Sequence, residues 1–146
     1  LGDFMLTTSF LDYSFRNGSL LPEIISLEKD GSLAKSAREI ALKLSIPLQE
    51  GTYTWTLGPS YETAAEIQDI IKIGGNAVGM STVPEIKTAV DFNMDFIVIS
   101  CLTNYGAGLE EKTLAHDSVL EMAAKVQNNY EQFVIEILKS HHTKKH

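Results

Sequence analysis

The sequence predicts an α/β fold, because segments with strand patterns alternate with segments with helix patterns along its 146 residues. One segment, Phe96-Ile97-Val98-Ile99, is continuously apolar, which is typical of a strand at the centre of a sheet with both faces covered. The chain is also 44% hydrophobic, so it can bury a core. We therefore expect a central sheet covered by helices.

The first thirty residues are expected to form one strand and one loop. Residues 3 to 8 have the pattern of a strand. Residues 10 to 31 contain three turn signals, which are Asn17-Gly18, Pro22 and Asp30-Gly31. A long connection is therefore predicted before the first helix.

The next two elements are predicted from residue spacing and composition. Apolar residues recur at helical spacing from Leu33 to Leu44, and Pro47 closes this helix. Residues 53 to 57 are rich in aromatic and β-branched side chains and stop at Gly58-Pro59, which predicts a strand followed by a break.

A second helix and a short strand are predicted next. Ser60 is a candidate cap for a helix whose apolar face runs from Ala64 to Ile71 and which ends at Gly74-Gly75. This cap places Glu62 in the first helical turn. The short strand spans residues 77 to 80.

The last two predicted helices differ greatly in length. Thr82-Val83-Pro84-Glu85 has the pattern of a capping box with proline in the first turn, which predicts a helix start. A long helix is expected from about Thr113 to Lys139, and residues 141 to 146 are expected to be a disordered tail. The three histidines of this tail lack acidic or cysteine partners at ligand spacing, so we expect no metal site there.

Composition excludes several classes of partner. The formal net charge is -7 and the basic residues are scattered, which argues against nucleic acid binding. No apolar run approaches the roughly 20 residues that span a bilayer, so no membrane partner is expected. Cys101 is the single cysteine, which rules out a disulfide within the chain and suggests a reducing cytoplasm.

Three short blocks carry most of the chemistry that the sequence suggests. They are Gly58-Pro59-Ser60-Tyr61-Glu62-Thr63, Ala77-Val78-Gly79-Met80-Ser81-Thr82-Val83-Pro84-Glu85 and Leu102-Thr103-Asn104. Each block follows a predicted strand, and in open α/β sheets ligands bind beyond the carboxyl ends of the strands. The sequence therefore predicts that an aromatic ring, a carboxylate, a hydroxyl and an amide share one rim of the sheet, as in a small-molecule site.

The three blocks resemble the carboxyl-terminal half of the trimeric purine nucleoside phosphorylases. The resemblance implies a mixed, largely parallel central sheet flanked by helices. Residues 1 to 140 match the carboxyl-terminal half of that single domain, so we expect the fold of this chain to be incomplete. It implies a phosphorolytic pentosyltransferase of purine salvage, which converts 6-oxopurine (deoxy)ribonucleosides to free base and (deoxy)ribose 1-phosphate. Such enzymes are homotrimers that use inorganic phosphate as co-substrate and need no metal or organic cofactor.

The resemblance gives catalytic or phosphate-binding roles to three residues that also have structural explanations. Ser81 matches a phosphate contact, although a hydroxyl at this position also caps a helix. Glu62 matches a carboxylate that accepts hydrogen bonds from the base, although a carboxylate in a first turn also stabilises the helix dipole. Asn104 matches an amide that stabilises negative charge on the departing base, although asparagine is also common in turns. Relatives that accept 6-aminopurines have aspartate there, so Asn104 points to inosine, guanosine or their 2′-deoxy forms.

Four further residues match substrate contacts of that family. Tyr61 matches an aromatic residue that packs on the purine, and Met80 matches a residue under the ribose; ordinary packing explains both equally well. His116 matches a histidine that contacts the ribose 5′-hydroxyl, and Val119 lines the same edge. A lone histidine in a first helical turn is more often only solvated, but the resemblance favours the ribose contact for His116.

Departures from the family pattern leave alternatives open. Nothing matches the glycine-rich phosphate loop, arginine and histidine of the family's amino-terminal half, and the chain begins at Leu1 rather than methionine, so we expect a fragment. Either Phe10 or Phe15 is a candidate for the phenylalanine that reaches a neighbouring subunit. The alternatives are a catalytically incomplete piece that only binds purine or assembles, and a methylthioadenosine phosphorylase-type relative, which Asn104 disfavours.

Overall fold

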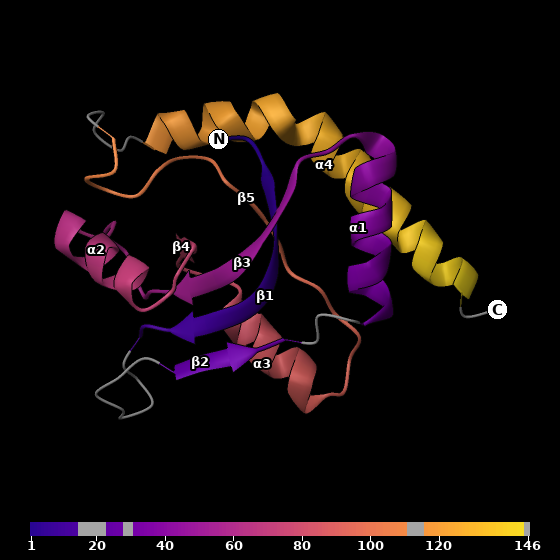
Figure 1. Ribbon diagram of the computed structural model, residues 1–146, viewed down its shortest axis with the longest axis horizontal. Coiled ribbons are helices and arrows are strands. Elements are labelled where there is room, and N and C mark those ends of the chain that lie inside the picture. Colours follow the sequence, from indigo (N-terminus) through magenta and orange to yellow (C-terminus); the bar gives the residue numbers. More distant parts are fainter. Residues whose placement is uncertain (15–22, 28–30, 111–115, 145–146) are drawn as a thin grey trace.

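The computed structural model describes residues 1–14, 23–27, 31–110 and 116–144 (Figure 1). The helices and strands within these ranges are, in chain order, β1 (Phe4–Asp12), β2 (Glu23–Ser26), α1 (Ser32–Leu44), β3 (Leu48–Trp55), α2 (Ala64–Lys72), β4 (Ala77–Gly79), α3 (Val83–Asp91), β5 (Ile99–Cys101) and α4 (His116–Lys144). This alternation of strands and helices confirms the predicted α/β class.

The strands form one mixed sheet whose central strand is β1. The order is β2-β1-β3-β4, and β5 pairs with β1 on the same side as β2 but at the other end of the strand. The β1/β3 and β3/β4 ladders are parallel, whereas β2 and β5 are antiparallel to β1. The longest ladder is therefore parallel, as expected of a largely parallel mixed sheet.

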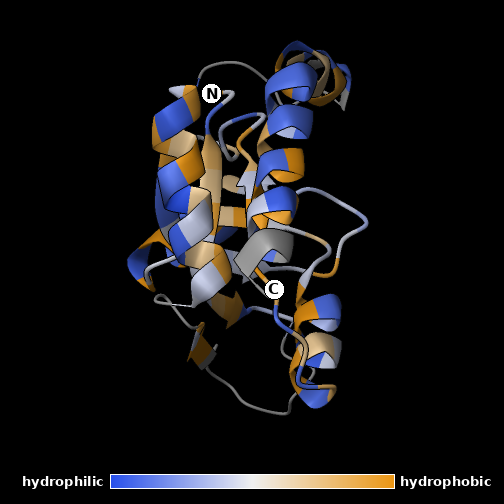
Figure 2. Cartoon of the chain, turned by 90° about the vertical axis from the view of Figure 1, so that its right-hand side faces the viewer, coloured by the Kyte–Doolittle hydropathy of each residue, from blue (hydrophilic) through white to orange (hydrophobic). Residues whose placement is uncertain are grey.

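Strand β1 is buried because apolar side chains point to both of its faces. Phe4 packs with Phe133 of α4 and with α1 in a first core, whereas its neighbour Met5 packs with Tyr53 and with α3 in a second core. Successive residues of a strand point to opposite faces, so one strand supplies both layers. Figure 2 shows the sheet edge-on between the helices on its two sides.

The predicted first strand and first loop are wrong in extent. Strand β1 continues to Asp12, and β2 pairs with its second half in the register Ser9 to Ser26, within the segment expected to be a loop. Two adjacent isoleucines, Ile24 and Ile25, explain this pairing, since β-branched residues suit a strand. The turn signals of residues 17 to 22 lie outside the described residues.

The later helices also differ from the expected bounds. Helix α4 runs from His116 to Lys144, so residues 141 to 144, expected in a disordered tail, are helical. This end of the helix has contacts with the rest of the described chain: the Ser140 hydroxyl lies 3.3 Å from the Ser36 hydroxyl of α1, and His141 lies 4.0 Å from the Asp95 carboxylate. Among the described residues, no helix combines the length and apolar character needed to cross a membrane.

Candidate functional site

The loops after β3, β4 and β5 carry the residues that the sequence singles out, but the strands do not all end at one rim. Strands β3 and β4 are parallel, so their carboxyl ends lie at the same edge of the sheet. Strand β5 is antiparallel to β1, and its last residue, Cys101, pairs with Phe4 at the start of β1. The ends of the three strands therefore do not by themselves bring the three blocks to one rim, as had been expected from the sequence.

The segment after β5 nevertheless returns to α2. A Cβ atom built on Gly106 lies 2.9 Å from the Ile67 side chain, and one built on Gly108 lies 2.8 Å from Cβ of Ala64. Both glycines are therefore needed for the close approach of this loop to α2. Through these contacts, the segment that contains Asn104 is joined to the helix that follows Glu62.

Glu62 is fixed to the ends of β3 and β4 rather than to a helix. Its carboxylate accepts a hydrogen bond of 2.5 Å from the Thr56 hydroxyl, and the Thr56 N–H donates to the Gly79 carbonyl at 3.0 Å. The expected cap at Ser60 is wrong, because Thr63 is the N-cap of α2. Glu62 therefore lies before the N-cap of α2, outside the first helical turn. The structural explanation that its carboxylate stabilises the helix dipole from the first turn is thus wrong.

A complete capping box at the start of α2 explains why the helix begins at Thr63. The Thr63 hydroxyl accepts from the Glu66 N–H at 3.3 Å, and the Glu66 carboxylate accepts from the Thr63 N–H at 2.7 Å. The hydrogen bonds from the backbone and side chain of Thr63 hold the pKa of Glu66 below its usual value. This box fixes the end of the loop that carries Glu62.

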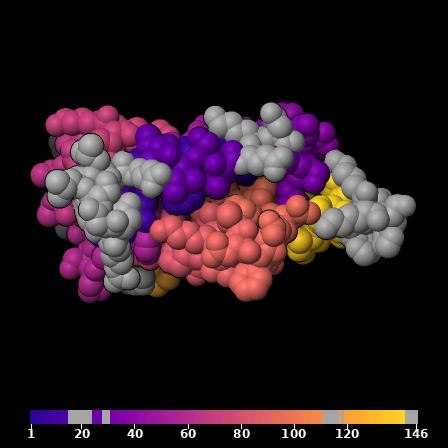
Figure 3. All heavy atoms as spheres, turned by 90° about the horizontal axis from the view of Figure 1, so that it is seen from below, coloured from indigo at the N-terminus to yellow at the C-terminus, as the bar shows by residue number. Residues whose placement is uncertain are grey.

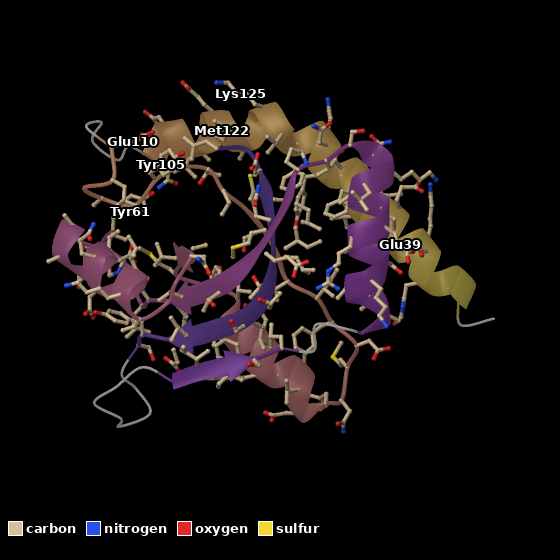
Figure 4. All side chains as sticks on the ribbon, viewed as in Figure 1. Glu39, Tyr61, Tyr105, Glu110, Met122 and Lys125 are labelled. Carbon is tan, nitrogen blue, oxygen red and sulfur yellow. The ribbon has the colours of Figure 1, made fainter. Side chains whose placement is uncertain are left out.

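Tyr61 and Met80 are partly open to solvent at neighbouring loops. Their relative exposures are 46% and 36%, so neither is an ordinary core residue in this chain. Gly58, at a φ of 67°, lies so close to Met80 that an added Cβ would be 2.5 Å from the Met80 sulfur. Figure 4 shows Tyr61 in the region between α2 and the start of α4, where Tyr105 is also labelled.

The predicted capping box at Thr82 does not form, although α3 begins where expected. Thr82 has a φ of 80° and a ψ of -46°, and the Val83 N–H donates to the Ser81 carbonyl at 3.0 Å. This is a γ-turn, a strained conformation for a β-branched residue that costs about 1–3 kcal/mol. Within the described residues, the N-cap Thr82 makes no side-chain hydrogen bond that caps α3, and the exposed Ser81 hydroxyl lies 3.3 Å from the Thr82 hydroxyl.

Tyr53 holds this strained turn, and sequence reasoning missed it. Its buried hydroxyl donates to the Ser81 carbonyl at 3.1 Å. The ring passes directly over Gly79, where an added Cβ would lie 2.2 Å from the Tyr53 oxygen. Gly79, directly before Met80 and Ser81, was the sequence signal for this contact, since a glycine in a strand often marks the close approach of another group.

Asn104 is held locally in this structure. Its side-chain oxygen accepts from the Thr103 hydroxyl at 2.8 Å, and its side-chain nitrogen donates to the Tyr105 carbonyl at 3.1 Å. Both bonds join sequence neighbours, as in a turn. The amide is half-buried, and both polar atoms of its side chain have partners.

The remaining predicted site residues have mixed outcomes. Val119 is half-buried on α4, whereas His116 begins that helix and its side chain lies outside the described residues. Phe15 is also outside the described residues. Phe10 packs in the second core with 2% exposure, which excludes it as the phenylalanine that projects toward a neighbouring subunit. Phe10 is buried because it pairs opposite Tyr53 in the central ladder.

A buried carboxylate lies near the same edge of the sheet. Asp12, the last residue of β1, accepts from Lys87 of α3 at 2.8 Å, and the Lys87 nitrogen lies 5.3 Å from the centre of the Trp55 ring. Burial opposes ionisation of Asp12, but hydrogen bonds from Lys87 and Ser14 outweigh it and lower its pKa. The pair joins α3 to the carboxyl ends of β1 and β3.

Comparison with known proteins identifies the family. The family model described as the phosphorylase superfamily matches residues 1–139. The chain belongs to the phosphorylase superfamily. It is 38% identical over 143 residues to purine nucleoside phosphorylase 1 of Bacillus subtilis, with 91% of this chain and 52% of that enzyme covered. Its identity to purine nucleoside phosphorylase 1 of Geobacillus stearothermophilus is 41% over 108 residues, with 74% of this chain and 39% of that enzyme covered.

Solved structures show the same phosphorylase fold. A Schistosoma purine nucleoside phosphorylase in complex with hypoxanthine superimposes with a TM-score of 0.83 at 24% identity, covering 94% of this chain and 55% of that one. The mixed, largely parallel sheet flanked by helices is thus confirmed as nucleoside phosphorylase-like. The chain spans about half the length of the relatives it matches, so the fold within its 146 residues is incomplete.

Proposed function

We propose that this chain forms part of a purine nucleoside phosphorylase that cleaves 6-oxopurine (deoxy)ribonucleosides with inorganic phosphate. The products are the free base and (deoxy)ribose 1-phosphate. The observation that carries this proposal is the 38% identity to the Bacillus subtilis enzyme over nearly the whole chain. The loops at the ends of β3 and β4 support it, because they present a carboxylate and a hydroxyl that no helix cap consumes.

Two residues handle the base in this proposal. Glu62, positioned by the Thr56 hydroxyl, accepts hydrogen bonds from the N1 side of a 6-oxopurine. Asn104 rotates from its local partners and donates its amide to N7 while negative charge develops on the departing base. An interaction that strengthens as this charge forms lowers the barrier more than it strengthens substrate binding.

The other residues position the sugar and the phosphate. Ser81 contacts phosphate from the γ-turn that precedes α3, where free amides and the helix dipole favour an anion. Met80 lies under the ribose, Tyr61 packs on the purine, and His116 with Val119 contacts the 5′ end of the nucleoside. Phosphate itself is the nucleophile, so the protein acts by orientation and charge stabilisation, without a metal or organic cofactor.

The assembled enzyme is proposed to be a cytoplasmic homotrimer in which this chain is the carboxyl-terminal half of each subunit. The half-length match also favours a second candidate function, in which the chain alone binds purine or assembles without catalysis. Release of hypoxanthine from inosine and phosphate separates the two, because only the catalytic function predicts turnover. Comparison of inosine with adenosine tests the weaker methylthioadenosine phosphorylase-type alternative, for which adenosine is the better substrate.

Substitution of Asn104 tests the mechanism. Asn104→Ala is expected to lower kcat/KM for inosine by roughly 10²-fold or more, the usual cost of removing a donor to developing negative charge. Asn129→Ala on the exposed surface of α4 is the matched control and should leave turnover unchanged. Equal kcat/KM values for Asn104→Ala and the unmodified protein remove Asn104 from the mechanism.

A further inference from the structure

The carbonyl of Ser81 is the point at which the core of the protein holds the loop before α3. Tyr53 of β3 is 5% exposed, and its hydroxyl donates a hydrogen bond to this carbonyl at 3.1 Å. The Val83 N–H donates to the same carbonyl at 3.0 Å. Ser81 itself is exposed. A buried side chain of the sheet therefore fixes the backbone of an exposed residue.

Fixing this carbonyl also fixes the N–H of the next residue. In a planar trans peptide such as Ser81–Thr82, the N–H points in the direction opposite to the C=O. The Thr82 N–H therefore points away from the Tyr53 hydroxyl and out of the second core. Among the described residues, no hydrogen bond has this N–H as its donor. It is thus available to an anion at the exposed side of the loop.

The turn needs this support because its conformation is strained. Thr82 has a φ of 80° and a ψ of -46°, which a β-branched residue rarely adopts. Such a conformation persists only where the surrounding structure holds it. The Tyr53 ring is fixed in turn, because it lies so close to Gly79 that an added Cβ would be 2.2 Å from the Tyr53 oxygen. The Tyr53 hydroxyl is therefore a rigid support for the turn.

We propose that Tyr53 is a positioning residue for phosphate. Its hydroxyl holds the Ser81–Thr82 peptide so that the Ser81 hydroxyl and the Thr82 N–H donate to one phosphate ion, while Tyr53 itself stays buried and does not touch the ion. Helix α3 begins directly after this turn and, with the segment after it, forms a large part of the face seen from below (Figure 3). Its N-terminal dipole adds to the attraction for the anion. This inference rests on the proposed function, in which phosphate is the co-substrate.

Phosphate binding to the chain tests the inference without turnover. Inorganic phosphate is titrated into the unmodified chain and into Tyr53→Phe, and the NMR signal of the Thr82 amide is followed. Tyr53→Phe keeps the ring, so circular dichroism should show a folded variant. Its dissociation constant for phosphate should rise about fivefold, the usual worth of one hydrogen bond. Tyr13→Phe is the matched control and should leave the constant unchanged, because the Tyr13 hydroxyl donates to Asp69 of α2 at 2.8 Å.

The kinetics of inosine phosphorolysis separate positioning from a general loss of structure. Tyr53→Phe should raise the KM for phosphate about fivefold. The KM for inosine should stay nearly unchanged, because the Thr56 hydroxyl, and not Tyr53, holds Glu62. A variant that only loses folded protein shows a lower apparent kcat, with neither KM value changed.

A second substitution tests whether Tyr53 acts through the strained turn. Glycine adopts a positive φ without strain, so Thr82→Gly makes the turn less dependent on support from the core. When Thr82→Gly is already present, adding Tyr53→Phe should therefore change the dissociation constant for phosphate by less than about twofold. A role of Tyr53 in packing alone predicts no such coupling.

Three results overturn the inference. They are an unmodified chain whose Thr82 amide does not respond to phosphate, equal dissociation constants for Tyr53→Phe and the unmodified chain, and a loss of the same size with and without Thr82→Gly. Phosphate binding that depends on Tyr53, without phosphorolysis of inosine, supports the inference and contradicts the proposed function. Phosphorolysis with equal KM values for phosphate in Tyr53→Phe and the unmodified chain does the reverse.

Discussion

The contact between Tyr53 and Gly79 predicts a measurable coupling between two substitutions. Gly79→Ala places a Cβ atom 2.2 Å from the Tyr53 oxygen and 2.9 Å from the ring carbon that bears it. Overpacking in a core costs about 1–3 kcal/mol, and the upper end applies because Tyr53 is buried and cannot move aside. We therefore expect Gly79→Ala to lower the free energy of unfolding by about 3 kcal/mol.

Tyr53→Phe removes the hydroxyl and should cost less. The Ser81 carbonyl loses one hydrogen bond but keeps the one from the Val83 N–H, so no buried acceptor is left unpaired. The expected loss is about 1 kcal/mol. In the double variant the nearest atom to the new Cβ is the ring carbon at 2.9 Å instead of the oxygen. The double variant should therefore be more stable, by about 1 kcal/mol or more, than the sum of the single losses predicts.

Urea denaturation of the chain measures this coupling directly. Trp55 is the single tryptophan and is buried in the same core as Tyr53, so its fluorescence reports the transition. The slope with urea should be equal among the four proteins if only stability changes. Losses that add within about 0.4 kcal/mol would refute the contact as the source of the destabilisation.

Three other substitutions test separate parts of the structure by the same denaturation. Thr63→Ala should cost about 1 kcal/mol by removing the N-cap of α2, and an unchanged midpoint contradicts the cap. Lys87→Met should cost about 1 kcal/mol at pH 7, after allowance for the half-exposed lysine. The pKa of Asp12 is lowered in the folded chain, so its ion pair with Lys87 stabilises the fold above the unfolded-state pKa and is lost as the pH falls through the folded-state pKa. The difference in free energy of unfolding between Lys87→Met and the unmodified chain should therefore shrink below about pH 4. A difference that stays constant with pH excludes the ion pair as its cause. Thr82→Gly relieves about 1–3 kcal/mol of backbone strain in the folded state, whereas the greater conformational entropy that glycine loses on folding costs about 1 kcal/mol. The free energy of unfolding should therefore stay equal or rise. A decrease of more than about 1 kcal/mol contradicts the strain at Thr82.

The helix starts show what local sequence signals can and cannot determine. Thr63 has glutamate three residues later, which is the signature of a capping box, and the box forms. Ser60 lacks this partner, so the correct start of α2 was available from the sequence. Thr82 has the same signature with Glu85, yet no box forms, because the contacts of Tyr53 hold the preceding turn in a conformation that only tertiary structure imposes.

The strands show a similar limit. The apolar pattern of residues 96 to 99 marks a strand, and its contacts with both cores agree with that pattern. The pattern contains no information on direction, so the antiparallel course of β5 was not predictable from local residues. Of the candidate site, Glu62 and Ser81 could be found by their positions after strands, whereas the supporting roles of Tyr53 and Thr56 depend on contacts between strands.

Strand β1 has a consequence for how the molecule unfolds. Its consecutive side chains are shared between the helix layers on opposite sides of the sheet, so neither layer can melt while the other stays intact. Fluorescence of Trp55 in one layer and circular dichroism of α1 and α4 in the other should therefore change together during denaturation, as one cooperative event.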